Sequence, residues 1–335
     1  MKKLSIMTLI VLFAATSVFA DGVVKKTKYE IEFGKFGTFS NVQTEMISRL
    51  KKATDSDSEF KGKGLLGKLA GKFALRSGEE TRIFNLSEMT ETEIDHRKKT
   101  YTVQPIEKYS PEDVEEPDEY EEETEMGEEE SDIKIIRNEF SVDKTGESRT
   151  INGFPSQKYA VTWILEWENI RTGEKGTNRL LTDIWTTPLT GDLQKGREIE
   201  QEFSREHMQR MGVDLQELQE EMLGTNWLSI FSRMDSQSQA PDPDASRFAD
   251  EMGKIEGYPV VIDGKYFTET EGGPQEEEES GIGGLLGGLA KKAIKKDKKD
   301  DPDQPALSYY IELLEYQTTG IPETEFQPPA GYQEK

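Results

Sequence analysis

Strict alternation of apolar and polar residues is the feature that most constrains the fold of this chain. It is clearest in the segment KYAVTWILEW at residues 158–167. Side chains of a strand point alternately to its two faces, so this spacing predicts a strand with one apolar face. The apolar residues, called the 159–167 stripe below, are Tyr159, Val161, Trp163, Leu165 and Trp167.

Similar but weaker patterns occur along most of the chain. Tyr29, Ile31 and Phe33 share one face of residues 28–33, and Tyr101 and Val103 share one face of residues 99–104. The other candidate strands are residues 43–50, 81–86, 89–95, 133–141, 177–187, 258–263, 265–271 and 306–318. About eleven strands with turn residues between them predict a mainly β protein with some α. We expect a curved antiparallel sheet or unclosed β-barrel covered by helices.

Residues 194–257 interrupt the strands with helical spacing. The apolar positions in this helical insertion are Ile199, Phe203, Met208, Met211, Leu215, Leu218, Met222 and Leu223, followed by Phe248, Met252 and Ile255. An apolar stripe of this period lies on one side of a helix. We expect these helices to pack across the sheet as its cover, with the methionines in the core.

Charge and cysteine content exclude several functional classes. The chain has 335 residues, a formal net charge of −24 and no cysteine. Nucleic acid binding requires a basic face, and thiol catalysis, disulfides and cysteine-ligated zinc sites require cysteine. Residues 107–132 are strongly acidic and residues 271–305 are of low complexity, so we expect solvated, unpacked insertions within a single domain at 21–335.

The first twenty residues have the form of a secretory signal. Lys2 and Lys3 precede a short apolar run, and small residues lead up to Ala20. This pattern predicts a signal peptide at residues 1–20 that is cleaved after Ala20. We therefore expect a soluble periplasmic protein, with secretion as the alternative.

Two segments share the pattern G-L-L-G-x-L-A, one at residues 62–74 and one at residues 281–294. Both are typical of amphipathic helices loosened by glycine, with lysines at the rim. Three interpretations remain open for these Gly-Leu segments: plugs of the open sheet, lids over an apolar cavity, or contacts to a membrane surface. Their candidate ligand-binding residues are Leu65, Leu66, Leu69, Leu285, Leu286 and Leu289.

The sequence offers little that is typical of an enzyme. His96 and His207 are the only histidines, and neither belongs to an H-E-x-x-H pair. There is also no G-x-S-x-G nucleophile elbow. We expect both histidines to be exposed polar residues, and we expect no catalytic residues, metal site or cofactor. A hydrolase of the export compartment remains as a further alternative, beside the two non-enzymatic hypotheses given below.

Several short motifs, taken in order, resemble one family of exported proteins. They are D-H-R-K-K-T-Y-T-V at 95–103, I-N-G-F at 151–154 followed by Lys158 and Tyr159, T-D-I-W-T-T at 182–187, I-E-G-Y-P-V at 255–260, and the closing segment at 321–332. Together they resemble the LolA-like family of periplasmic lipoprotein carriers and their relatives. The resemblance implies an incomplete antiparallel β-barrel around helices, with an apolar cavity that in the carriers holds acyl chains.

These observations lead to two functional hypotheses. The first is an exported, non-enzymatic binding protein whose apolar cavity accepts a lipid or a lipoprotein acyl chain, with transient contact to a membrane surface. Its candidate ligand-binding residues are the 159–167 stripe and the leucines of the Gly-Leu segments. The alternative is a structural or stress-related interaction protein with a filled barrel, whose acidic loops contact a basic partner. The stripe is compatible with both, because aromatic residues fill cores as well as ligand sites.

Overall fold

The computed structural model describes residues 19–34, 36–64, 78–108, 133–212, 245–271 and 304–335. Most of the expected signal peptide lies outside these residues, as do residues 109–132, 213–244 and 272–303. The described part begins with a strand at Phe19, so Phe19 and Ala20 pair with the last long strand, at Pro322 and Ile321. Cleavage after Ala20 stays a prediction.

The described residues form one sheet of twelve strands in the order β12-β6-β5-β4-β3-β2-β1-β11-β10-β9-β8-β7. The strands are β1 (Phe19–Phe33), β2 (Gly37–Ser48), β3 (Lys51–Gly62), β4 (Gly78–Asn85), β5 (Thr90–Asp95), β6 (Thr100–Pro105), β7 (Ile133–Ile151), β8 (Phe154–Asn169), β9 (Lys175–Thr187), β10 (Tyr258–Glu271), β11 (Leu307–Pro322) and β12 (Gln333–Glu334). Neighbours are antiparallel except for the short β12–β6 pair. The prediction of a large, unclosed, mainly antiparallel sheet is confirmed.

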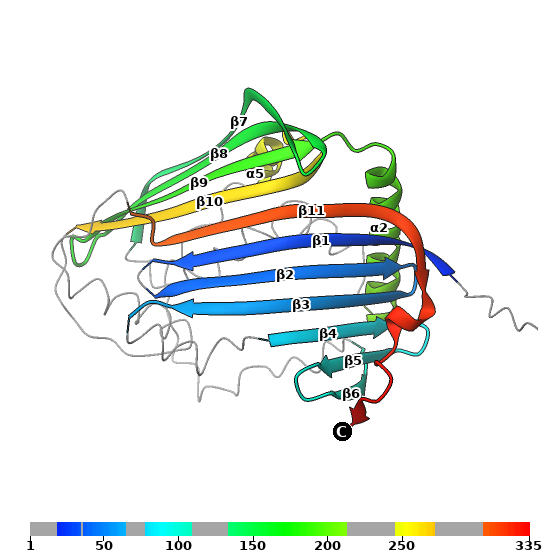
Figure 1. Ribbon diagram of the computed structural model, residues 1–335. Coiled ribbons are helices and arrows are strands. Elements are labelled where there is room, and N and C mark those ends of the chain that lie inside the picture. The colour runs from blue at the N-terminus through cyan, green and yellow to red at the C-terminus, as the bar shows by residue number, and fades with distance from the viewer. Residues whose placement is uncertain (1–18, 35, 65–77, 109–132, 213–244, 272–303) are drawn as a thin grey trace, which may run out of the picture.

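The topology consists of two meanders joined at the centre. Strands β1 to β6 follow one another across one side of the sheet, and β7 to β11 follow one another across the other side. The pairing of β1 with β11 joins the two meanders along almost the whole of both strands. Figure 1 shows the resulting bend, in which β7 to β10 turn away from the plane of β1 to β6.

The described residues contain two α-helices, α2 (Asp192–Met211) and α5 (Ala245–Met252). Both lie on the same side of the sheet, behind it in Figure 1, and we call that side the helix face. Helix α2 crosses β11, β1 and β2, whereas α5 packs near β7. Helix α2 ends at Gly212, whose left-handed backbone (φ 81°) lets its N–H bond the carbonyls of Met208 and Gln209.

The apolar residues of the predicted helical region pack as expected only in part where they are described. Met208 and Met211, which we expected in the core, are half-buried and belong to none of the apolar clusters. Phe203 of α2 is buried in the cluster beneath that helix, and Ile199 packs against it. Phe248 of α5 is buried against β7 and β8, with Met252 and Ile255 beside it. Leu215, Leu218, Met222 and Leu223 lie outside the described residues.

The expectation that helices cover the sheet is only partly correct, because the strands carry apolar residues on both faces. A cluster around Ala53, Ile83 and Ile94 lies on the face opposite the helices. It is covered by the C-terminal segment, whose 3₁₀ helix η2 (Glu323–Phe326) buries Phe326 there. Figure 1 places this segment in front of the sheet and α2 behind it.

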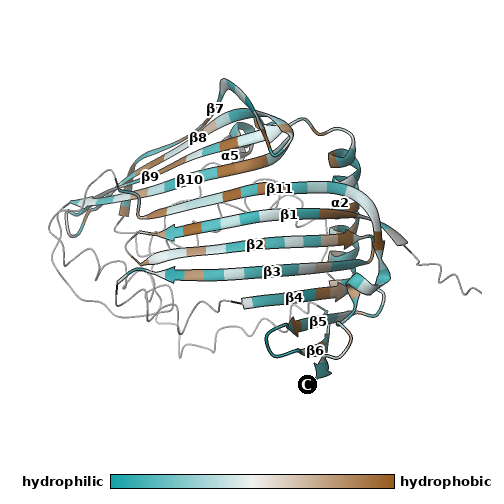
Figure 2. Ribbon diagram, viewed as in Figure 1, coloured by the Kyte–Doolittle hydropathy of each residue, from teal (hydrophilic) through white to brown (hydrophobic). Residues whose placement is uncertain are grey.

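The structure differs from the expected strands at β3 and at β10 for identifiable reasons. Strand β3 was not expected, because its sequence is almost entirely polar (Figure 2). Ala53 is its one buried residue. Full pairing to β2 and β4 holds it in the sheet. Residues 258–263 and 265–271 form one strand, because Gly264 is not a turn residue. The ring of Tyr309 covers Gly264, where a Cβ would lie 2.0 Å from that ring.

A second glycine sets how closely α2 approaches the sheet. Gly196 is buried, and a Cβ there would lie 2.3 Å from the Tyr316 hydroxyl oxygen of β11. Gly196→Ala gains about 1 kcal/mol in helix propensity but overpacks this contact at a cost of about 1–3 kcal/mol. We expect a net loss of about 1 kcal/mol in the free energy of unfolding, measured by urea denaturation.

The Tyr316→Leu background provides the control. Once the ring is removed, Gly196→Ala should stabilise the protein by up to about 1 kcal/mol, as helix propensity dictates. Equal destabilisation in both backgrounds would show that the Tyr316 contact is not the cause.

Candidate functional site

The structure brings the 159–167 stripe together on the helix face of β8. Each of its residues pairs in register with a helix-face residue of β9, from Ile184 opposite Tyr159 to Gly176 opposite Trp167. The leucines of the two Gly-Leu segments, Leu65, Leu66, Leu69, Leu285, Leu286 and Leu289, lie outside the described residues. Their contribution to a ligand site stays a prediction.

Most of the stripe is packed against protein. Tyr159, Val161 and Leu165 are each 1% exposed. Tyr159 and Val161 contact a cluster that includes Phe248 of α5. The Trp167 ring covers Gly176, where a Cβ would lie 2.3 Å from it.

Trp163 connects the stripe to a second apolar group on the helix face. Its indole N–H donates to the side-chain oxygen of Asn138, 2.9 Å away. The group, called the strand cluster below, contains buried Leu180 and Leu307 with Ile31, Phe33, Trp163, Tyr266 and Tyr309 around them. All these residues come from strands, whereas the clusters beneath α2 and α5 include helix residues.

The strand cluster also contains one polar pair. The Tyr309 hydroxyl lies 2.7 Å from the Thr182 hydroxyl. Burial raises the pKa of Tyr309 to about 12, so this phenol is neutral at physiological pH.

A cavity of about 690 Å³ lies where β7 turns into β8, and we call it the tip cavity. Its lining is Ser148, Arg149, Thr150, Pro155, Ser156, Gln157, Tyr159, Thr186, Pro188, Leu189, Glu256 and Gly257. Tyr159 is the one residue of the predicted stripe that reaches it. The sequence did not predict a site at this turn.

The β7–β8 turn fixes the shape of this region. Asn152 and Gly153 have positive φ angles of 50° and 86°, as the Asn-Gly sequence of a two-residue hairpin favours. The Asn152 amide donates to the Leu313 carbonyl (2.9 Å) and to the Glu312 carboxylate (3.0 Å) of β11. The hairpin tip is therefore tied to a strand that lies beyond β9 and β10 in the sheet.

A smaller cavity of about 350 Å³ lies between α2 and the first meander. It is lined by Lys25, Ile47, Lys52, Phe84, Glu200, Phe203, Ser204 and His207. Charged groups thus line this cavity beside the apolar side chains of Ile47, Phe84 and Phe203, and none of the predicted ligand-binding residues is among its lining.

A charge network centred on the buried Glu45 adjoins this smaller cavity. Lys25 and Glu45 are opposite each other in the β1–β2 register, and their charged atoms are 2.7 Å apart. Lys25 also lies 3.2 Å from Glu200 of α2, and Lys52 of β3 forms a close ion pair with Glu45. The three strands and the helix are therefore joined by one alternating set of charges.

The surrounding charges stabilise the ionised forms of Lys25 and Glu45, the two central residues of the network. Burial alone would lower the pKa of Lys25, but Tyr258, Glu45 and Glu200 outweigh burial and raise it. Burial would raise the pKa of Glu45, but Lys25 and Lys52 outweigh it and hold that pKa below its usual range. Both groups therefore remain charged at neutral pH, and neither is poised for proton transfer there.

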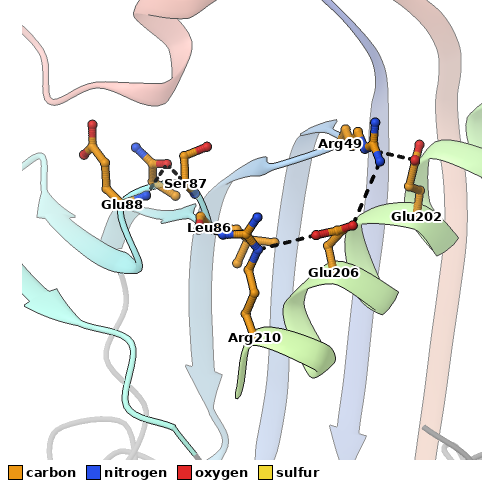
Figure 3. Close-up of polar contacts among 8 residues, drawn as sticks. Arg49, Leu86, Ser87, Glu88, Glu202, Glu206 and Arg210 are labelled. Carbon is orange, nitrogen blue, oxygen red and sulfur yellow. Dashed lines mark hydrogen bonds and ion pairs between the residues drawn. The ribbon is translucent and has the colours of Figure 1, made fainter. Parts of the chain in front are cut away.

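Polar contacts at the ends of β2 and β4 fix the C-terminal half of α2 (Figure 3). Arg49 lies 3.0 Å from Glu202 and 4.0 Å from Glu206. Arg210 donates to the Leu86 carbonyl (2.6 Å) and also lies 3.4 Å from Glu206. At the other end, Thr318 donates to the Asp192 carboxylate (2.7 Å).

The expectation that both histidines are exposed is wrong, because other side chains pack against them and leave both half-buried. His207 packs between the rings of Phe84 and Phe203, at 5.3 Å and 5.8 Å, and burial lowers its pKa. His96 is held between the Thr81 hydroxyl (2.6 Å) and the hydroxyl of Tyr332 in the C-terminal segment (3.0 Å). Thr81 in turn donates to Asp55 (2.5 Å).

Comparisons of the chain with family models, curated proteins and solved structures found no match. Within the described residues, no cluster of three or more histidine, aspartate or glutamate side chains is arranged to hold a metal ion. None of the described helices has the length and apolarity needed to cross a membrane.

The charge network predicts a pH-dependent stability. Because the folded-state pKa of Glu45 is depressed, its contribution is present above the unfolded value of about 4.3 and is lost as pH falls through the folded pKa. Glu45→Gln should therefore lower the free energy of unfolding at pH 7 by about 3 kcal/mol. It should also weaken the loss of stability between about pH 5 and pH 3. Urea denaturation across this range measures both effects.

Glu59→Gln is the matched control, because Glu59 pairs with Lys61 at 3.0 Å on the exposed part of β3. It should change stability by about 0.5 kcal/mol or less. If the two variants had the same stability and the same acid transition, the buried network would not stabilise the fold.

Proposed function

We propose that this chain is an exported, non-enzymatic binding protein that accepts an apolar chain, such as the acyl chain of a lipid or lipoprotein, on the helix face of its sheet. Export rests on the signal-like residues 1–20, and we place the protein in the periplasm on the same grounds. The resemblance of its motifs to LolA-like carriers agrees with this proposal.

The observation that carries the proposal is the strand cluster. Its partly buried members, among them Trp163, Tyr266 and Tyr309, present large apolar surfaces on the same face as α2 and α5. Aromatic side chains each contribute about 150–250 Å² of contact surface. Ligand sites are typically lined by such residues with a few polar groups that orient the ligand. The neutral Tyr309–Thr182 hydroxyl pair is a polar group of this kind.

The order of the cluster in the sheet suits an extended ligand. Ile31, Tyr309 and Leu180 come from β1, β11 and β9, and Tyr266 and Trp163 come from β10 and β8. The cluster therefore runs across five adjacent strands. A flexible acyl chain lying across the strands would contact these side chains in turn, and burial of about 100 Å² of its surface would contribute about 2.5 kcal/mol.

One observation favours the second candidate, an interaction protein with a filled interior. Tyr159, Val161 and Leu165, at the centre of the predicted ligand surface, are almost completely enclosed by protein. In that case the strand cluster is ordinary core, and function resides on the surface of the protein.

Quenching of tryptophan fluorescence by a brominated fatty acid separates these functions. Trp163 and Trp167 belong to the 159–167 stripe, whereas Trp185 pairs with Lys158 and belongs to a different cluster, the one that contains Phe203 of α2. We expect brominated palmitate to quench the full chain saturably. Trp163→Phe combined with Trp167→Phe should remove most of that quenching, and Trp185→Phe should leave it. Native mass spectrometry of protein purified from the periplasm should show a bound acyl species.

Absence of both quenching and bound lipid would contradict the first function and favour the second. Quenching that depends on Trp185 instead would place an apolar ligand outside the strand cluster and would also contradict the first function.

A further inference from the structure

The Arg149 side chain extends from the β7–β8 hairpin and stacks on an aromatic ring of β9. Its guanidinium carbon lies 4.0 Å from the centre of the Trp185 ring of β9. Stacking on an aromatic ring restricts the orientation of a guanidinium group while leaving its N–H groups free to donate. Arg149 is exposed and lines the tip cavity, so these donors are accessible from the cavity.

The charge of Arg149 is not neutralised by a carboxylate within the described residues: none lies within 4.0 Å of its guanidinium group. Arg179 offers a direct comparison, because it lies 5.1 Å from the Phe267 ring but also pairs with Glu269 at 2.7 Å. In a chain with a net charge of −24, an arginine without such a partner is a position where an anion can bind.

The two neighbouring lysines, Lys144 and Lys158, are less available than Arg149 to bind an anion. Lys144 lies 3.7 Å from Glu256, which also lines the cavity. Lys158 is 2.8 Å from Asp183 and 3.4 Å from Glu147. Each lysine therefore already has a carboxylate partner.

The remaining lining supplies hydrogen-bond donors and an apolar wall. Among described residues, the side chains of Ser148, Thr150 and Gln157 have no hydrogen-bond partner, whereas Ser156 already donates to the Phe154 carbonyl at 2.9 Å. Tyr159 and Leu189 contribute apolar surface. The volume of about 690 Å³ lies within the range of sites for small organic ligands.

We propose that the tip cavity binds a ligand through a phosphate or carboxylate group, which the Arg149 guanidinium holds with hydrogen bonds from the hydroxyl and amide groups around it. The anion belongs either to a small molecule or to the headgroup of an amphiphile. This site shares no residue with the strand cluster, so it goes beyond the acyl-binding function and is tested separately.

The experiment measures binding of three probes to the full chain: inorganic phosphate by equilibrium dialysis, dodecyl phosphate by tryptophan fluorescence, and phosphatidylglycerol vesicles by co-sedimentation. Arg149→Gln should weaken binding of at least one probe by about tenfold or more, because it removes a charge-assisted bidentate contact. Arg149→Lys keeps the charge but loses the planar fork, so its affinity should be intermediate. Arg179→Gln, the stacked but already paired arginine, should leave affinity unchanged.

The pattern across probes identifies the source of the anion. Equal affinity for inorganic phosphate and dodecyl phosphate indicates a small anion, whereas binding of dodecyl phosphate or vesicles alone indicates a headgroup. The proposal is overturned if no probe binds at millimolar concentration, or if Arg149→Gln and Arg179→Gln weaken binding equally. If this proposal is overturned but brominated palmitate still quenches the Arg149→Gln variant as it quenches the unsubstituted chain, the acyl-binding function is unaffected. Urea midpoints of both glutamine variants confirm that the comparison is between folded proteins.

Discussion

The pairing of β1 with β11 is the interaction on which the rest of the structure depends. It joins the first described strand to the last long strand and so unites two antiparallel meanders in one sheet. Helix α2 crosses this junction, where Gly196 allows a close approach to β11 and Glu200 reaches Lys25 of β1. Without the junction, each meander would present an additional unpaired edge, and α2 could not pack against β11 together with β1 and β2.

A single sheet with apolar residues on both faces needs coverings on both faces. Helices α2 and α5 cover the helix face in two places, and the C-terminal segment covers part of the opposite face through Phe326. The β7–β8 hairpin tip is tied to β11 by Asn152, and its Arg149 lies over Trp185. The candidate sites occur between these coverings, since the strand cluster contains no helix residue and the tip cavity lies at the hairpin turn.

Sequence patterns predicted the features that depend on local spacing. The 159–167 stripe forms the expected strand, and Phe248 and Met252 of α5 pack in one cluster with Ile255, which follows the helix. The sequence of β3 does not alternate between apolar and polar residues, so its strand could not be predicted. Backbone pairing to β2 and β4 holds it in the sheet. The Lys25–Glu45 ion pair could not be predicted without the register between β1 and β2. The stacking of Arg149 on Trp185 could not be predicted without the bend of the β7–β8 hairpin. One local signal for that bend was present, the Asn-Gly dipeptide at the hairpin turn.

Hydrogen exchange of the amides of β1 and β11 tests the central claim most directly. If their pairing unites the two meanders, the central amides of both strands should be among the slowest to exchange. They should also exchange through the same cooperative opening as those of β2 and β10. Amides of β1 and β11 that exchange rapidly, or two meanders that open in separate transitions, would contradict a single sheet organised around this junction.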